Sequence, residues 1–240
     1  MGYVKLDEVI EEAGKEKVEI KNDYISIEEM SPVELVVKKS RFIGMAFHVQ
    51  DENEAHQIIG SVRKSNKNAT HVCYAYALGE TINVAKNNDD GEPAGSAGAP
   101  IFEAIKQSHL TYTLVVVVRY FGGTELGKGK LTRVYNATAI GAINNAKKFK
   151  MVFCNELEIK VPYSSYGSVS KLFTDNSVKI IEQKNDESMP LIKIAVPAKA
   201  SERLLEGIRS KTRGASQINK YGTGFYKFEY KVVIGEEEAK

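Results

Sequence analysis

The densest group of chemically reactive side chains in the sequence is an acidic loop that begins at Asp89. Asp89, Asp90 and Glu92 place three carboxylates within four residues, and carboxylate oxygens are hard ligands that could share a Mg²⁺ ion. His71 stands just before an apolar, strand-like segment and could act as a general base. One candidate function is therefore a metal-assisted hydrolase or phosphoryl-type enzyme that uses Asp89, Asp90, Glu92 and His71.

The same loop also has a purely structural interpretation. Asp, Gly and Pro in this order are common in turns, and carboxylates can fix a loop by accepting backbone N–H bonds. Since no second acidic or histidine motif at ligand spacing completes a metal shell, no catalytic residue, metal or cofactor is assigned, and Mg²⁺ belongs only to the alternative. The residues expected to shape the loop are Asp89, Asp90, Gly91, Glu92, Pro93, Gly95, Ser96 and Gly98.

A second chemically distinctive stretch is the glycine-rich, basic turn that follows the run of valines. Glycine lets backbone N–H groups approach an anion, and a helix start favours negative charge. The spacing is neither GxxxxGK[ST] nor GxGxxG, so nucleotide hydrolysis and a dinucleotide fold are not indicated. A tight turn whose lysines face water is the simpler alternative. The residues predicted to contact nucleic acid or phosphate are Arg119, Tyr120, Gly122, Gly123, Lys128, Lys130 and Arg133.

The charges are distributed unevenly along the chain. The formal net charge is only +2, but residues 1–30 hold four Lys against nine acids, a balance of −5, and residues 98–150 hold eight Lys and Arg against two Glu, a balance of +6. Such an excess can attract anions locally. Lys38, Lys39 and Arg41 form a further basic group, which the sequence alone does not place beside the glycine-rich turn.

The composition is that of an ordinary globular protein. A chain of 240 residues with 42% hydrophobic and 27% charged residues is expected to form two domains. Because no apolar run reaches about 18 residues and the start of the chain is acidic, we expect no membrane contact, no secretion and a cytoplasmic location. Cys73 and Cys154 lie in apolar stretches and are expected to be two buried thiols.

Hydrophobic periodicity predicts strands first, then helices interleaved with strands on one face of a sheet. Four successive valines at 115–118 predict a strand buried on both faces. Asp51 and Glu54 predict a helix start with a capping box. The other segments expected in this part are a weak helix over 5–17, strands over 24–28, 33–37 and 42–49, a hairpin of 72–78 with 81–84, a short helix from residue 100 and a longer helix over 129–147.

A second pattern begins near residue 152. Its order is strand, helix, strand, strand, helix, strand, which is the split βαβ arrangement. Both patterns together predict an α+β protein.

Four segments of the sequence resemble the signature segments of the IMPACT/YigZ family. They are KSRFIG at 39–44, ATHVCYAY at 69–76, DDGEPAGSAGAPI at 89–101 and VVVVRYFGGTELGKGKLTRVY at 115–135. The resemblance implies a ribosomal protein S5 domain 2-like N-terminal domain and a ferredoxin-like C-terminal domain. The expected organisation is an acidic extension at 1–23, the IMPACT-type domain at 24–150, the ferredoxin-like domain at 151–235 and a charged tail at 236–240.

The resemblance also implies a function. Members of the family are linked to control of translation, and bacterial members to nucleic-acid or ribosome binding without an established activity. We therefore expect a non-enzymatic, translation-associated regulator that binds RNA or the ribosome through the basic glycine-rich face. The enzyme described above and a protein-interaction adaptor remain the alternatives. At two positions Lys130 and Val134 replace the glycine and alanine of the family turn.

Overall fold

The structure is a computed structural model that describes residues 23–28, 32–186 and 189–230. The chain divides into two compact units, one formed mainly by residues 23–151 and the other mainly by residues 152–227. Both units are mixed α/β, and the strand pairs within their sheets are antiparallel. The helix expected over 5–17 and the tail at 236–240 lie outside the described residues.

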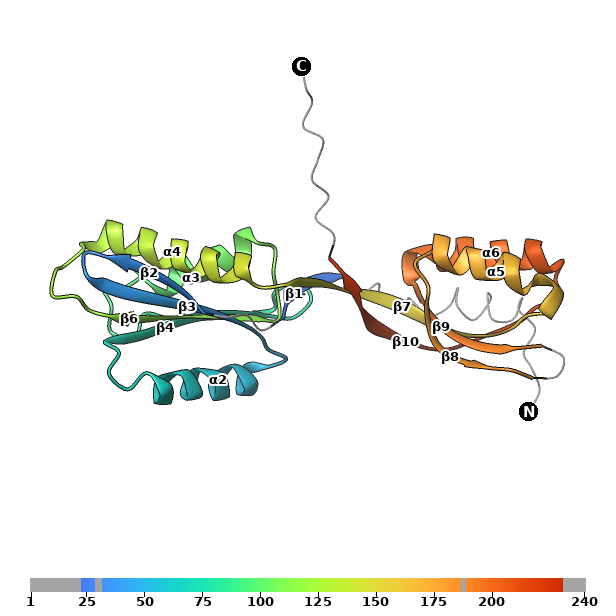
Figure 1. The fold of residues 1–240 in the computed structure, drawn as a ribbon, viewed down its shortest axis with the longest axis horizontal. Coiled ribbons are helices and arrows are strands. Elements are labelled where there is room, and N and C mark those ends of the chain that lie inside the picture. Colours follow the sequence, from blue (N-terminus) through green and yellow to red (C-terminus); the bar gives the residue numbers. More distant parts are fainter. Residues whose placement is uncertain (1–22, 29–31, 187–188, 231–240) are drawn as a thin grey trace, which may run out of the picture. The chain divides into compact units, whose positions relative to one another are not determined.

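The first unit is built on a five-stranded sheet (Figure 1). Its strands, in spatial order, are β2 (Val33–Val37), β3 (Ser40–His48), β6 (Thr113–Tyr120), β4 (His71–Leu78) and β5 (Val84–Asn88). The central strand β6 has neighbours on both sides, and its four valines are 0% exposed. The prediction of a strand buried on both faces is confirmed.

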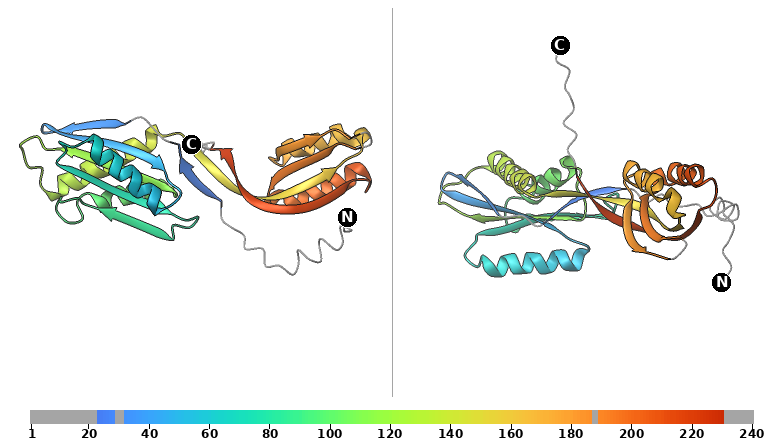
Figure 2. Two further views of the ribbon diagram at one scale, coloured as in Figure 1. Left: turned by 90° about the horizontal axis from the view of Figure 1, so that it is seen from below. Right: turned by 45° about the vertical axis from the view of Figure 1, so that its right-hand side comes forward.

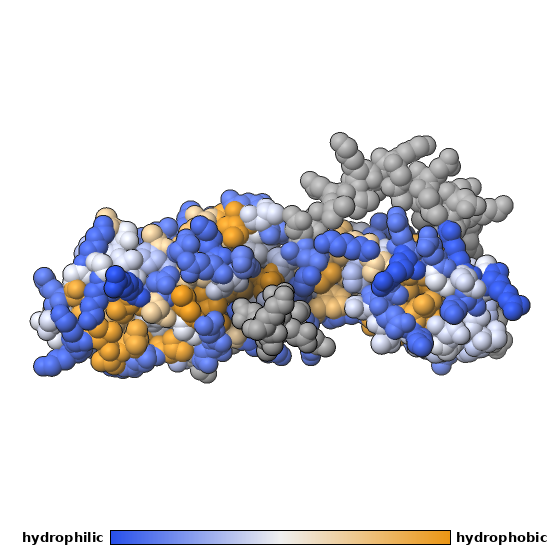
Figure 3. All heavy atoms as spheres, turned by 90° about the horizontal axis from the view of Figure 1, so that it is seen from above, coloured by the Kyte–Doolittle hydropathy of each residue, from blue (hydrophilic) through white to orange (hydrophobic). Residues whose placement is uncertain are grey.

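Helices cover both faces of this sheet (Figures 1 and 2). Helices α3 (Gly98–Gln107) and α4 (Lys128–Asn145) pack with Val115 and Val117, whereas α2 (Glu52–Ser65) packs with Val116 and Val118. The expectation of helices on one face was wrong, because side chains alternate along a strand and an entirely apolar strand needs apolar cover on both sides. Seen from the α3 and α4 side, the first unit carries mostly hydrophilic side chains with smaller apolar areas between them (Figure 3).

Two local predictions, the capping box at Asp51 and Glu54 and the start of the second hairpin strand, differ from the structure in detail. The Asp51 side chain accepts the Glu54 N–H at 2.8 Å, as expected for a helix N-cap, but the Glu54 carboxylate accepts the N–H of Gln50 rather than that of Asp51. The second hairpin strand begins at Val84 instead of residue 81, because Ile82 takes a positive φ of 56° inside the turn. None of the described helices is long and apolar enough to span a membrane.

The second unit contains the predicted order of strands and helices. Its elements are β7 (Lys148–Lys160), α5 (Tyr163–Asp175), β8 (Lys179–Lys184), β9 (Leu191–Pro197), the 3₁₀ turn η1 (Ala198–Ala200), α6 (Ser201–Thr212) and β10 (Gln217–Glu229). The strand order is β10–β7–β9–β8, and α5 and α6 share one apolar core with β7 and β9. Residues 148–151, at the start of β7, pair with β1 (Tyr24–Ile27), whereas residues 154–160 of β7 pair with β9.

The turn between β2 and β3 lies against the segment that follows β6. Lys38 and Lys39 form this turn with φ values of 45° and 64°, the left-handed region that two-residue hairpins require. Gly122 packs so closely on the Lys39 backbone that a Cβ there would overlap the Lys39 carbonyl group, and its N–H donates to Ser40 Oγ at 3.1 Å. This close approach explains the glycine without any ligand.

We expect Gly122→Ala to lower the free energy of unfolding by about 1–3 kcal/mol, because the added methyl group must displace backbone atoms of Lys39. The matched control is Gly129→Ala in α4, where a Cβ would meet nothing within 4 Å; this change should leave the free energy unchanged or raise it. Urea unfolding of both variants measures the difference, and equal stability of the two would contradict the packing argument.

Candidate functional site

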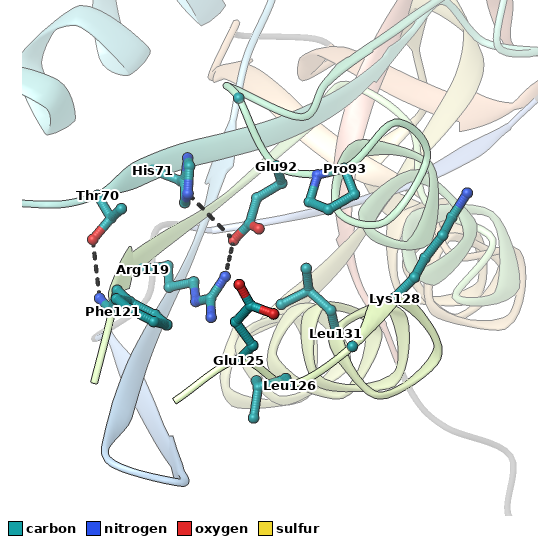
Figure 4. Close-up of a pocket in the computed structure, with 12 residues that line it drawn as sticks. Thr70, His71, Glu92, Pro93, Arg119, Phe121, Glu125, Leu126, Lys128 and Leu131 are labelled. Carbon is teal, nitrogen blue, oxygen red and sulfur yellow. Dashed lines mark hydrogen bonds and ion pairs between the residues drawn. The ribbon is translucent and has the colours of Figure 1, made fainter. Parts of the chain in front are cut away.

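A pocket of about 510 Å³ opens at the end of β6 (Figure 4). Four segments line it: the start of β4, the acidic loop, the end of β6 and the chain that leads into α4. The first three segments lie far apart in the sequence, and the antiparallel pairing of β4 with β6, which places His71 opposite Arg119, brings the first and third together. The pocket therefore unites both stretches that the sequence marks as chemically distinctive.

The centre of the pocket wall is a buried ion pair between Glu92 and Arg119. Arg119 Nη1 donates to Glu92 Oε1 at 2.6 Å, and their side chains are only 3% and 6% exposed, for Glu92 and Arg119 respectively. Tyr135 Oη donates to the same Oε1 at 2.7 Å. The guanidinium carbon of Arg119 also lies 5.3 Å from the Phe42 ring centroid and 5.4 Å from that of Phe121, within the range of cation–π attraction. The Arg119 side chain is thus fixed by one carboxylate and two aromatic rings.

His71 presents one ring nitrogen to this ion pair. Its Nδ1 lies 2.7 Å from the carbonyl oxygen of Asp90, and since a carbonyl can only accept, Nδ1 carries the hydrogen. Nε2 lies 3.8 Å from Glu92 Oε1. The bond to the backbone therefore sets both the orientation of the ring and the nitrogen that faces the pocket.

The thiol and phenol beneath the pocket are held in their protonated forms. Burial raises the pKa of Cys73 to about 12. Burial also raises the pKa of Tyr135, and the neighbouring Cys73 and Glu92 act in the same direction. Tyr135 can therefore serve as a hydrogen-bond donor to Glu92, and Cys73 is not a reactive thiolate. Cys73 and Cys154 are both buried thiols and form no disulfide, as predicted.

Asp89 shapes the acidic loop through its backbone contacts. Its carboxylate accepts the N–H groups of Gly95, Ala97 and Gly98 at 2.8–2.9 Å. Burial acts to raise the pKa of Asp89, but these three donors, helped by the nearby charge of Lys128, outweigh burial and lower it. In the same loop the Ser96 hydroxyl is buried and has no hydrogen-bond partner among the described residues, and the Ser96 N–H donates to the Pro93 carbonyl.

Asp90 has partners of its own, different from those of Asp89 and Glu92. It makes a two-bond ion pair with Arg63 at 2.8 and 3.1 Å and accepts the Val72 N–H at 2.7 Å. Asp89, Asp90 and Glu92 are thus each engaged with different partners. Within the described residues no group of three His, Cys, Asp or Glu side chains is placed to hold a metal ion, so the Mg²⁺ alternative lacks a ligand set in this part of the chain.

The structure separates the basic residues that the sequence grouped together. Arg119 is buried in its ion pair, whereas Tyr120 lies on the α2 side of the sheet and donates to Asn66 Oδ1 at 2.8 Å. Gly123 has a φ of 81° and open space around it. The exposed cations of this group are Lys128, Lys130 and Arg133 on α4.

Sequence reasoning did not identify Tyr135 as a site residue. Its position on the apolar face of α4 predicts burial, which is observed. A buried tyrosine hydroxyl usually has a hydrogen-bond partner, and that requirement was the available signal. Glu125 and Leu126, which also line the pocket, carry no comparable signal in the sequence.

We expect Glu92→Ala to lower the free energy of unfolding by about 3–5 kcal/mol, because it leaves the buried Arg119 charge without its partner. Urea unfolding measures the loss. Glu125→Ala is the control, because Glu125 is an exposed pocket residue with no ion pair among the described residues; it should change stability little. The double variant Glu92→Ala/Arg119→Met should be more stable than Glu92→Ala, and a double variant as unstable as the single one would argue against a charge effect.

We expect Asp89→Asn to cost about 1–3 kcal/mol near neutral pH, because an amide cannot accept all three backbone bonds. Since the folded pKa of Asp89 is lowered, its contribution is complete above the unfolded-state pKa of about 3.9 and is lost as the pH falls through the folded value. Urea unfolding of wild type and variant across acidic pH should therefore show their difference shrinking below about pH 4. Asp51→Asn, which preserves an equally good N-cap, should show little difference at neutral pH.

Comparisons with known proteins place these residues in a family context. Residues 38–143 match the Impact N-terminal domain. The IMPACT family member YvyE of Bacillus subtilis is 32% identical over 197 residues, which cover 82% of this chain and 90% of that protein. The IMPACT family member YigZ of Escherichia coli is 30% identical over 192 residues, which cover 78% and 94%.

The chain was also compared with solved structures. A crystal structure described only as that of a hypothetical protein is 27% identical and has a TM-score of 0.54, covering 84% of this chain and 98% of that one. A structure of the two-domain translational regulator Yih1 is 24% identical over 50% of this chain, with a TM-score of 0.31 that is too low to bear on the fold. From the matched domain and the extent of identity to its bacterial relatives, the chain belongs to the IMPACT family.

Proposed function

We propose that this chain is a non-enzymatic, translation-associated protein that binds RNA through an exposed basic surface at the end of β6. The surface differs from the face expected from the sequence, because Arg119 and Tyr120 are not part of it. It consists of Lys38, Lys39, Lys128, Lys130 and Arg133, all of which are exposed.

The observation that carries this proposal is the turn between β2 and β3. Glycine and asparagine are favoured where φ is positive, because other residues are strained there by roughly 1–2 kcal/mol. Here two exposed lysines, Lys38 and Lys39, occupy both such positions. Strained residues that persist on a surface point to a function, and two adjacent cations suit contact with a phosphate backbone.

The second half of the basic surface lies on the first turns of α4. Lys130 and Arg133 are three residues apart and therefore lie on the same side of the helix. The first turn contains no acid, so the positive end of the helix dipole adds to the lysine charges. Phe121, 47% exposed, directly precedes Gly122, which packs on Lys39, and offers a ring on which an unpaired base could stack.

Membership of the IMPACT family supports a role in translation, because the resemblance to that family implies a link to the control of translation. Ribosomal RNA is the natural target in that setting, and the protein would then work in the cytoplasm. We also infer that the first unit is S5 domain 2-like and the second ferredoxin-like. The element order βαββαβ and the strand order β10–β7–β9–β8 of the second unit support the latter assignment.

We expect Lys128→Ala/Lys130→Ala to weaken binding to single-stranded RNA and to reduce the slope of log K against log salt concentration by about 1.4, because each lost phosphate contact removes about 0.7. Fluorescence anisotropy with a labelled oligonucleotide at several salt concentrations measures both effects. The matched control is Lys106→Ala/Lys147→Ala, which removes two exposed lysines near the other ends of α3 and α4.

The control pair should bind like wild type. An equal loss in both pairs would indicate a response to net charge alone, and salt-insensitive or absent binding to RNA and ribosomes would refute the proposal. A stable complex that survives nuclease treatment would favour the protein-interaction adaptor instead.

A further inference from the structure

The N-terminus of α4 faces the Glu92–Arg119 pocket without a side-chain cap. Its N-cap residue is Gly127, with a φ of 75°, and no side chain in the described part of the chain caps the first-turn N–H groups. Gly127 and Lys128 both line the pocket. The free N–H groups and the helix dipole favour an anion at this position, but a helix start alone does not make a site.

A second, independent feature points to a ligand. Arg119 is 5% exposed, lines the pocket and directs its guanidinium group into it (Figure 4). Only Nη1 is hydrogen-bonded, to Glu92; the buried Nε has no partner in the described part of the chain. A buried donor without a partner is costly and uncommon in folded proteins, and an arginine offers five donors in a fixed plane.

The same wall also offers hydrogen-bond acceptors. Glu92 Oε1 is occupied by Arg119 and Tyr135, whereas no described residue donates to Oε2. His71 has its Nδ1 bonded to the backbone and turns Nε2 toward the pocket. Pro93 and Leu131 add apolar surface. At about 510 Å³ the pocket is of a size that suits small organic ligands and is larger than an inorganic ion needs.

We propose that this pocket binds a small phosphate monoester. Its phosphate group lies at the N-terminus of α4, where backbone N–H groups, Lys128 and the free donors of Arg119 surround it from more than one side. The hydroxyl-bearing part of the ligand faces Glu92 Oε2 and His71 Nε2. This site shares only Lys128 with the exposed basic surface, and it does not require that surface to bind RNA.

The decisive variant is Gly129→Asp, at the second helical position of α4. A Cβ at this position would meet nothing within 4 Å, and an acid in the first turn stabilises a helix. The variant should therefore keep or raise the melting temperature of the full chain. It should nevertheless weaken binding of glycerol 3-phosphate, measured by titration calorimetry, by about tenfold or more, because its carboxylate competes with the phosphate for the first-turn N–H groups and the helix dipole.

Two further variants make the test specific. Glu125→Gln removes an exposed carboxylate that lines the pocket, so binding should become about two- to fivefold tighter through lost repulsion. Arg133→Ala removes a cation of the basic surface that does not line the pocket, so binding should stay within about twofold of wild type while RNA binding weakens.

Inorganic phosphate and a short RNA without a terminal phosphate complete the comparison. Competition by inorganic phosphate, with no competition by the RNA, supports a monoester site. The proposal is overturned if glycerol 3-phosphate binds more weakly than about 10 mM, if Gly129→Asp binds it like wild type, if Arg133→Ala weakens it as much as Gly129→Asp does, or if the RNA displaces it.

Discussion

The buried ion pair between Glu92 and Arg119 is the interaction on which the pocket of the first unit depends. Arg119 ends the apolar central strand, and a charge buried there without a partner would cost several kcal/mol. The acidic loop must therefore reach the end of β6 to supply Glu92. Because Tyr135 donates to the same oxygen, α4 is tied to this point as well, and three segments distant in sequence are fixed together.

Much of the fold follows from local sequence patterns. The valines of β6 predict a strand buried on both faces, and the periodicity of residues 152–230 gives the observed element order. The path of the acidic loop does not follow from local patterns, because the contact of Glu92 with Arg119 spans 27 residues and depends on how the loop closes. The alternation of side chains along a strand could, however, have placed Arg119 and Tyr120 on opposite faces before the structure was known.

The excess positive charge of residues 98–150 has two different physical roles. Arg119 is desolvated and neutralised by Glu92, so it contributes little to the long-range field. Lys128, Lys130 and Arg133 remain in water, where their charges attract polyanions in a salt-dependent way. A charge count adds these groups together, and only burial separates a cation that organises a pocket from cations that form a surface. This difference explains why the exposed surface and the pocket can recognise separate ligands although they are adjacent.

The first turn of α4 belongs both to the pocket and to the exposed basic surface. An acid there would stabilise the helix by about 0.3–1 kcal/mol, and a serine or aspartate at the N-cap would add a further bond. The chain instead has Gly127, Lys128, Gly129 and Lys130. These residues provide neither a side-chain cap nor an acid that would interact favourably with the helix dipole. Departures from locally stable choices concentrate at functional sites. Since Glu92 already neutralises Arg119, the positive potential that an anion would meet in the pocket must come largely from this uncapped helix start.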